Sequence, residues 1–270
     1  MEDAEQLYLD MVKRGVTYLL YGQEMLTPVV PDNFVERMVV GALRWKKVLA
    51  MKRIPVDQRN RMEGRDWPPL ALTMIGMERL NNVQACMEDA LAKDVPGDLI
   101  EAGTWRGGAG IFMRAILKAY GVTNRSLWIA DSFEGLPTPD PKQFPADEFY
   151  VDDVPTFLAV GLEQVKQGFK RFGLLDDQVH FAKGWFKDTL PSLADKRWAV
   201  VRIDADMYES TMQALEMLYP NLSVGGYVIV DDYGGLDSCR DAVDHYRKRN
   251  AIIEEVRKVD WTAVYWQKLQ

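Results

Sequence analysis

The chain has 270 residues, 47% of them hydrophobic, so it can bury one substantial core and falls within the size range of a single α/β domain. Its formal net charge of -7 argues against a nucleic-acid partner, because nucleic-acid binders usually present a basic face. No run of about 18 apolar residues appears, and residues 1–10 are acidic, unlike the start of a signal peptide. These features predict a cytoplasmic protein with neither a membrane nor a nucleic-acid partner.

Histidine and cysteine are scarce. Cys86 and Cys239 lie far apart without a CxxC pair, which predicts reduced, structural thiols. His180 and His245 are the two histidines, so a multi-histidine metal site is excluded. Acid-base or metal chemistry therefore depends largely on carboxylates.

The first 96 residues have a helical pattern. Stretches 4–21, 32–51 and 72–93 show helical spacing, and no strand of comparable strength separates them. We expect residues 1–96 to form an N-terminal helical cap or dimerisation segment. The stretch 52–69, rich in Arg, Asp and Pro, is a candidate boundary or active-site loop.

From residue 97 onward, short apolar runs alternate with amphipathic ones. Strands are expected at 98–102, 126–131, 179–182, 198–204, 227–231 and 262–267, with a further one within 253–259. Helices are expected at 108–120, 156–172, 210–218 and 237–248. Residues 97–270 should thus form one α/β domain with a mostly parallel sheet of about seven strands. The proline-rich stretch 137–155 is long for a connection and predicts a lid.

Glycines follow the first of these strands, in Glu101-Ala-Gly103-Thr104-Trp-Arg-Gly107-Gly108. Glycine lets the backbone turn tightly and approach a ligand, and the helix that follows begins with unpaired N–H groups. The spacing differs from the GxGxxG of a dinucleotide site. It fits a smaller ligand, with Glu101 accepting a hydrogen bond from an ammonium group. A plain strand-to-helix turn would also favour glycine, although four glycines between positions 103 and 110 exceed what a turn needs.

The second and third strands end in candidate nucleoside contacts. Asp131 lies about 28 residues after the glycine turn, where open α/β sheets hold a ribose diol, and Ser132 follows it. Gly184 and Trp185, after the third strand, could frame an adenine ring. Together with the glycine motif, these residues predict a nucleoside ligand.

Aspartates follow the fourth and fifth strands, as Asp204-Ala-Asp206 and Asp231-Asp232. The carboxyl ends of adjacent parallel strands meet at one edge of a sheet, so these four side chains should converge beside the nucleoside site. Four carboxylates so close repel one another unless a cation compensates them. A single aspartate at a strand end often only caps a turn. Two converging pairs instead favour a hard, oxygen-liking ion, Mg2+ above all.

With these motifs, the chain from about Arg61 onward resembles the macrocin, mycinamicin and novobiocin type (TylF family) of sugar O-methyltransferases from antibiotic biosynthesis. The resemblance rests on Asp66-Trp-Pro, Thr73-Met-Ile-Gly, the glycine motif, Asp131-Ser-Phe-Glu-Gly-Leu-Pro, Asp204-Ala-Asp-Met-Tyr-Glu-Ser-Thr and Gly225-Gly-Tyr-Val-Ile-Val-Asp-Asp-Tyr-Gly. It implies a Rossmann-like class I S-adenosylmethionine-dependent methyltransferase. The implied acceptor is a deoxysugar hydroxyl of a small glycoside, such as a macrolide or aminocoumarin, and the implied assembly is a homodimer or higher homo-oligomer.

The resemblance also implies roles for individual residues. The implied contacts to S-adenosylmethionine are Glu101, Gly103, Asp131 and Ser132, the implied metal ligands are Asp204, Asp231 and Asp232, and Asp206 is the candidate base. Ala205 stands where the family is expected to have glycine, a small change that should not disturb ligation. Which of Asp204 and Asp206 binds the metal, and which takes the proton, stays open at this point.

Three other readings compete. A metal-dependent catechol or phenol O-methyltransferase would chelate the same ion through an acceptor that is already acidic, so it needs less from an aspartate base. An aminopropyl transferase shares the fold but needs no metal, which counts against it. A catalytically silent binding protein is disfavoured by acidic residues at every expected strand end.

Overall fold

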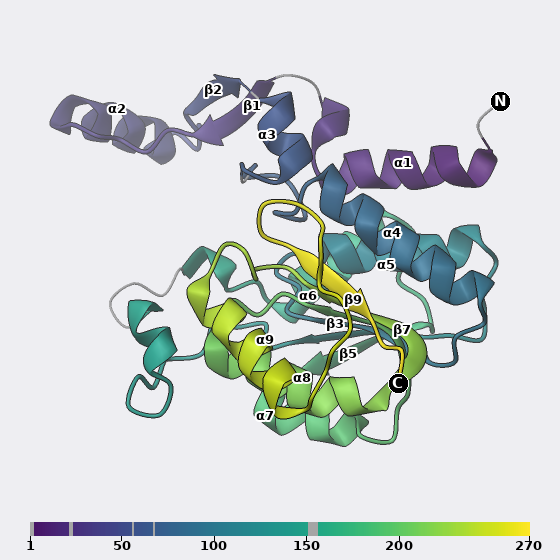
Figure 1. Ribbon diagram of the computed structural model, residues 1–270. Helices are drawn as coiled ribbons and strands as arrows, with labels where there is room; N and C mark the ends of the chain where they lie inside the picture. The colour runs from purple at the N-terminus through teal and green to yellow at the C-terminus, as the bar shows by residue number, and fades with distance from the viewer. Residues whose placement is uncertain (1–2, 22–23, 56, 67, 151–155) are drawn as a thin grey trace.

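A seven-stranded sheet forms the centre of the computed structural model, which describes residues 3–21, 24–55, 57–66, 68–150 and 156–270 (Figure 1). The strand order is β5-β4-β3-β6-β7-β9-β8. The strands are β3 (Asp98–Ala102), β4 (Leu127–Asp131), β5 (Val179–Lys183), β6 (Trp198–Ile203), β7 (Leu222–Val230), β8 (Arg257–Lys258) and β9 (Val264–Gln267). Pairing is parallel from β5 to β7, and β9 runs antiparallel to β7 and β8. The predicted mostly parallel sheet is confirmed.

Helices cover both faces of this sheet (Figure 1). One core contains α1 (Ala4–Val16), α4 (Met77–Ala92), α5 (Gly108–Ala119) and α6 (Leu162–Arg171). The other contains α8 (Tyr208–Leu218) and α9 (Asp237–Arg249), with the short α7 (Phe186–Thr189) and η4 (Leu190–Leu193) beside them. Every residue of β6 is buried, as expected for a parallel strand covered on both faces.

The N-terminal segment divides into two parts. Helices α1 and α4 share a core with α5, where Leu9 and Phe112 are fully buried. In contrast, α2 (Phe34–Trp45) and the hairpin of β1 (Glu24–Pro28) and β2 (Met51–Pro55) lie away from the sheet (Figure 1). The sequence pattern showed helical stretches in this segment and did not reveal the hairpin. Exposed residues, including Lys52 and Arg53, occupy most of β2, so no apolar alternation marked the strand in the sequence.

Several element boundaries also differ from the prediction. The expected helix 156–172 is split into η3 (Thr156–Leu158) and α6, because Gly161 is extended and serves as the N-cap of α6. The expected helix 32–51 ends at Trp45, and α3 (Gln58–Glu63) lies within the presumed loop 52–69. Strand β7 begins five residues earlier than expected, before the bend at Gly225, where φ is 88°. Both cysteines are free and buried, as predicted. Among the described helices, none is both long and apolar enough to cross a membrane.

Candidate active site

A cavity of about 750 Å3 opens where β3, β4, β6 and β7 end at their carboxyl edge. Nine of the twelve predicted site residues line it: Gly103, Thr104, Asp131, Ser132, Trp185, Asp204, Asp206, Asp231 and Asp232. The parallel sheet brings these side chains together from positions more than a hundred residues apart, as the strand pattern predicted. The candidate nucleoside contacts and the aspartates therefore share one cavity.

Glu101, Gly107 and Gly184 do not line this cavity. Glu101 is 1% exposed, and its carboxylate accepts hydrogen bonds from Arg202 (2.7 Å) and from the Thr104 hydroxyl (2.8 Å). A Cβ on Gly107 would meet Val165, and one on Gly184 would meet Thr189, both at 2.8 Å. These three residues pack against or hydrogen-bond to neighbouring residues outside the cavity lining. The arrangement does not support a direct contact between Glu101 and the ammonium group of a ligand.

Gly103 has a packing role that the sequence did not reveal. Its φ is 89°, and a Cβ there would lie 1.8 Å from the carbonyl oxygen of Asp204. Glycine thus allows the loop after β3 to touch the chain directly after β6. The candidate nucleoside loop and the aspartate loop are thereby held in contact.

Backbone donors fix the orientation of Asp131. Its Oδ2 accepts from the Thr104 amide and its Oδ1 from the Phe133 amide, both at 2.7 Å. The Ser132 hydroxyl also donates to Oδ1, at 3.4 Å, and the carboxylate still lines the cavity. Burial raises the pKa of Asp131, and these backbone hydrogen bonds oppose that shift.

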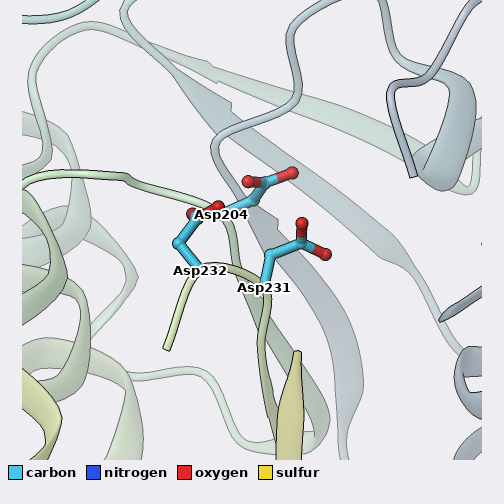
Figure 2. Close-up of side chains that lie close together, drawn as sticks. All are labelled: Asp204, Asp231 and Asp232. Atoms are coloured by element: carbon cyan, nitrogen blue, oxygen red, sulfur yellow. The ribbon is translucent and has the colours of Figure 1, made fainter. Parts of the chain in front are cut away.

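Three aspartates form a compact cluster at the floor of the cavity. One carboxylate oxygen from each of Asp204, Asp231 and Asp232 lies within 4.8 Å of the other two (Figure 2). Asp204 follows β6, and the Asp231-Asp232 pair follows the neighbouring β7. Three of the four aspartates that were predicted to converge therefore meet in this cluster, and the fourth, Asp206, lines the same cavity.

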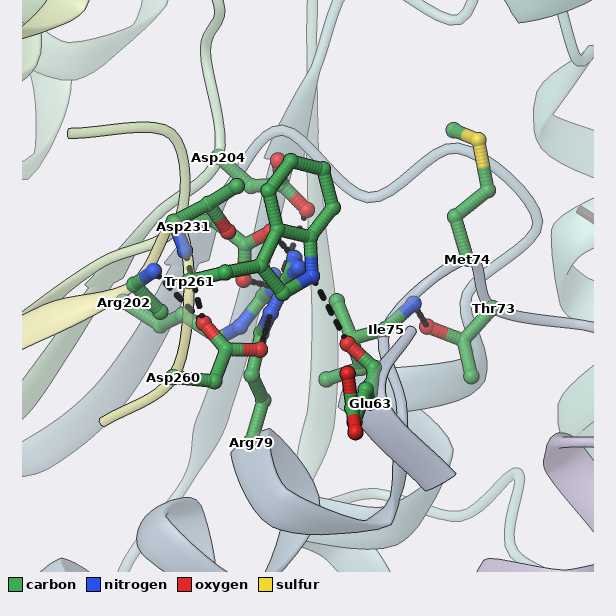
Figure 3. Close-up of polar contacts among 12 residues, drawn as sticks. Glu63, Thr73, Met74, Ile75, Arg79, Arg202, Asp204, Asp231, Asp260 and Trp261 are labelled. Carbon is green, nitrogen blue, oxygen red and sulfur yellow. Dashed lines mark hydrogen bonds and ion pairs between the residues drawn. The ribbon is translucent and has the colours of Figure 1, made fainter. Parts of the chain in front are cut away.

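Two buried guanidinium groups hold this cluster (Figure 3). Arg202 of β6 donates to Glu101 (2.7 Å), Asp204 (3.0 Å) and Asp231 (2.6 Å). Arg79 of α4 donates to the other oxygen of Asp231 and to Asp260 (2.6 Å). Both oxygens of Asp231 therefore accept from arginine in the protein alone.

The two arginines do not compensate all of the negative charge. Burial, together with neighbouring carboxylates, raises the pKa of Asp204 and raises that of Asp232 well above its ordinary value. Among the described residues, the buried Oδ2 of Asp232 has no hydrogen-bond partner. A divalent cation would compensate this excess negative charge and would give the Oδ2 of Asp232 a partner. The donor set therefore fits a hard ion with oxygen ligands.

Asp206 differs from the other aspartates in its surroundings. It lies outside the three-residue cluster, and no hydrogen bond to its carboxylate occurs within the described part of the chain. Burial first, then Asp204 and Asp231, raises its pKa to about 7. An unpaired carboxylate with such a pKa is suited to accept a proton near neutral pH.

Removal of the Asp206 charge should change how the stability of the metal-free protein depends on pH. The folded protein binds this proton more tightly than the unfolded chain does, because the pKa rises from 3.8 to about 7 on folding. The contribution of this proton to the free energy of unfolding is fully present below about pH 4 and is lost as the pH rises through about 7. In EDTA, urea titrations should show Asp206→Asn gaining stability over wild type across this window. A constant difference would contradict the prediction.

The predicted lid is described for residues 137–150, whereas residues 151–155 lie outside the described residues. Its buried Asp147 accepts from the amides of Tyr208 (2.6 Å) and Glu209 (3.0 Å), the first two residues of α8. The adjacent N-cap residue, Met207, makes no side-chain cap. Asp147 thus caps α8 from a distant segment and holds the lid segment beside Asp206.

Replacing Asp147 with alanine should cost about 1 kcal/mol of stability, as the loss of a helix cap does. It should also release the 137–150 segment, so trypsin should cleave after Lys142 faster than in wild type. The matched control is Asp57→Ala, which removes the carboxylate cap of α3 at the amides of Arg59 (2.9 Å) and Asn60 (3.1 Å). Equal cleavage rates in the two variants would argue against the docking role of Asp147.

Sequence reasoning missed Arg202, Arg79, Asp260 and Asp147. Arg202 left a signal, since a charged residue interrupts the apolar run of β6 two positions before Asp204, on the same face of the strand. Arg79 and Asp260 left none, because their contacts with the site join residues 152 and 181 positions apart.

Comparison with known proteins connects this geometry to a family. Residues 5–268 match the family model described as Macrocin-O-methyltransferase (TylF). A Streptomyces olivaceus protein named 8-demethyl-8-(2,3-dimethoxy-alpha-L-rhamnosyl)-tetracenomycin-C 4'-O-methyltransferase is 47% identical over 98% of this chain and 94% of its own length. The demethyldecarbamoylnovobiocin O-methyltransferase of Streptomyces niveus is 50% identical over 77% of this chain and 80% of its own.

A solved structure supports the same relationship. The O-methyltransferase NovP superimposes with a TM-score of 0.83 at 41% identity, covering 98% of this chain and all of its own. The resemblance noted from the motifs is therefore confirmed along nearly the whole chain, including the N-terminal residues before Arg61. The expected class I methyltransferase fold is confirmed as well.

Proposed function

The chain belongs to the macrocin O-methyltransferase (TylF) family of S-adenosylmethionine-dependent O-methyltransferases, and on this premise we propose that its acceptor is a sugar hydroxyl. The sugar is a deoxyhexose attached to a secondary metabolite, as the rhamnosyl acceptor named for the Streptomyces olivaceus relative suggests. Mg2+ is the proposed metal. The observation that carries the proposal is the position of Asp206, whose carboxylate has no hydrogen-bond partner among the described residues, in one cavity with the cluster of Asp204, Asp231 and Asp232.

Each residue has a proposed role in this reaction. Asp131, Ser132 and Trp185 bind the nucleoside of the methyl donor, and Gly103 and Thr104 form the turn beneath it. Asp204, Asp231 and Asp232 would hold the cation, which when bound lowers the pKa of a nearby hydroxyl. Asp204 suits ligation better than proton transfer, because Arg202 already holds its carboxylate.

Asp206 takes the acceptor's proton in this scheme. As the hydroxyl oxygen bonds to the donor's methyl carbon, the carbon–sulfur bond breaks and sulfur keeps the electron pair, which leaves S-adenosylhomocysteine. The proton resides on the Asp206 carboxylate until it passes to solvent. The lid segment, docked through Asp147, keeps water from the reacting atoms.

A substrate panel tests the proposal. The chain is incubated with S-adenosylmethionine and either rhamnosylated tetracenomycin, an aryl rhamnoside or a catechol, with Mg2+ or with EDTA. We expect methylation of a glycoside that EDTA abolishes and added Mg2+ restores. Preference for the catechol would favour the phenol O-methyltransferase alternative, and full activity in EDTA would remove the metal from the scheme.

We also propose that residues 1–96 provide the contact between subunits of a homo-oligomer. Large apolar side chains of α2 are exposed, including Phe34 (74%), Val35 (68%) and Trp45 (84%), and contiguous exposed apolar surface commonly marks an interface. Light scattering should find a dimer or larger species in wild type and a smaller one in the double variant Val35→Glu/Met38→Glu, since Met38 of α2 is exposed as well. A monomeric wild type would oppose the proposal.

A further inference from the structure

Both oxygens of the Asp231 carboxylate accept hydrogen bonds from arginine in the metal-free protein. Arg202 donates to its Oδ1 at 2.6 Å and Arg79 donates to its Oδ2. The Asp231 side chain is only 5% exposed, so both pairs lie away from water. A cation that binds this carboxylate must therefore compete with a guanidinium group.

The two arginines are attached differently. Arg202 belongs to β6 and also pairs with Glu101 and Asp204, so it is fixed within the sheet. Arg79 projects from α4 and bridges Asp231 to one further carboxylate, that of Asp260 (Figure 3). Either guanidinium group would keep a buried partner after giving up Asp231, but for Arg79 that partner is Asp260 alone, so Asp260 decides whether Arg79 is retained.

Asp260 is buried and is held in place by backbone hydrogen bonds. Its side chain is 1% exposed, and its Oδ1 accepts from the amides of Thr262 (2.9 Å) and Ala263 (2.8 Å). Its Oδ2 accepts from Nε of Arg79 at 2.6 Å. The adjacent Trp261 is fixed in turn, because its indole N–H donates to the Glu63 carbonyl at 2.9 Å. Asp260 therefore stays in place whether or not Arg79 contacts Asp231.

A buried guanidinium group without a partner is costly, and breaking such a pair usually destabilises a protein strongly. If Asp231 were the sole partner of Arg79, cation binding would carry this cost. With Asp260 present, the positive charge of Arg79 is shared between two carboxylates. Asp231 is then less completely neutralised and more available to a cation.

We propose that Arg79 is the counter-cation of the metal-free site, and that Asp260 is a positioning residue that retains Arg79 so that Asp231 can accept a divalent cation. The inference rests on the metal role of Asp231 in the proposed function. It adds a residue outside the aspartate cluster that sets the affinity of the cluster for the ion. The Arg79–Asp260 pair does this from α4 and the turn before β9.

A double-mutant cycle with Mn2+ as the probe tests the proposal without turnover. The dissociation constant of Mn2+ is measured by electron paramagnetic resonance for wild type, Asp260→Asn, Arg79→Gln and the double variant. Asp260→Asn should weaken binding roughly tenfold, because Arg79 then neutralises Asp231 alone. Arg79→Gln should tighten it. In the Arg79→Gln background, Asp260→Asn should change the dissociation constant less than about twofold.

The double-mutant cycle distinguishes an effect of Asp260 that acts through Arg79 from the direct electrostatic effect of losing the Asp260 charge. A field effect alone makes Asp260→Asn weaken binding equally in both backgrounds, and that result, or no change in either, would overturn the proposal. Where Arg79→Gln does not fold, Arg79→Met serves in its place. Wild-type protein that does not bind Mn2+ would instead refute the metal part of the proposed function.

A second arginine–aspartate pair, whose arginine is buried and whose carboxylate is partly exposed, supplies the control. Arg114 of α5 donates to both oxygens of Asp176, at 2.9 and 2.6 Å, and neither residue lines the cavity. Asp176→Asn and Arg114→Gln should leave the Mn2+ dissociation constant unchanged, although both lose an arginine–aspartate ion pair with two hydrogen bonds. Weaker Mn2+ binding in Asp176→Asn would mean that general destabilisation explains the Asp260 result, which would overturn the proposal.

Discussion

Asp232→Asn should lower turnover by about three orders of magnitude while making the metal-free protein more stable. Activity should fall because the variant loses one of the three carboxylates proposed to hold the cation. Stability should rise because the Oδ2 of Asp232 is buried without a partner and lies among Asp204, Asp206 and Asp231. Asparagine keeps the shape of the side chain and removes its share of the repulsion.

The measurements for Asp232→Asn are initial rates with Mg2+ and thermal unfolding in EDTA over a series of rising pH values, because deprotonation increases the repulsion that the variant relieves. Asp231→Asn is the informative comparison. It should also be inactive, but it should lose stability, about 3–5 kcal/mol, because two buried guanidinium groups lose a charged partner. An active Asp232→Asn, or one less stable than wild type, would contradict the account of the cluster.

Asp206→Asn should lower turnover to a similar degree, by about 10²- to 10⁴-fold, the usual contribution of a general base. Unlike the variants of the cluster, it should keep most of its affinity for Mn2+, because it loses the field of a neighbouring charge and no ligand, and it should keep its affinity for S-adenosylhomocysteine. The reason is geometric: Asp206 lies outside the group formed by Asp204, Asp231 and Asp232. Calorimetric titration of the inactive variant with each ligand separates the two effects.

Asp204→Asn is the paired test for Asp206. The proposed roles require that Asp204→Asn loses Mn2+ affinity and that Asp206→Asn retains it. The opposite pattern would exchange the ligand and the base between these two residues. Retained activity in Asp206→Asn would leave proton removal to another group or to water.

Local sequence patterns predicted most of the sheet. Strand β3 matched residue for residue, and β4, β5 and β6 matched within one residue at either end, because buried parallel strands are short apolar runs. The hairpin of β1 and β2 was missed because β2 is largely exposed and carries no apolar alternation. The break before α6 was also missed, because the extended Gly161 interrupts an otherwise helical spacing.

The residues of the candidate site also fall into those that the sequence predicts and those that it does not. The cavity aspartates could be predicted because each lies at the end of a strand or within three residues after it, and parallel strands end at one edge of the sheet; they are Asp131, Asp204, Asp206, Asp231 and Asp232. Glu101 lies next to the last residue of β3, yet its side chain turns to Arg202 and does not line the cavity. Sequence position alone does not reveal to which partner a strand-end side chain turns.

The sequence by itself determined the alternation of strands and helices, the edge where the carboxylates gather and the family to which the chain belongs. The tertiary structure alone decided which charges meet: Arg79 with Asp231 and Asp260, and Asp147 with the first turn of α8. Periodicity reflects the burial of each residue within its own element, so it can be read locally. An ion pair between residues 152 positions apart depends on how the helices pack against the sheet, which no local pattern encodes.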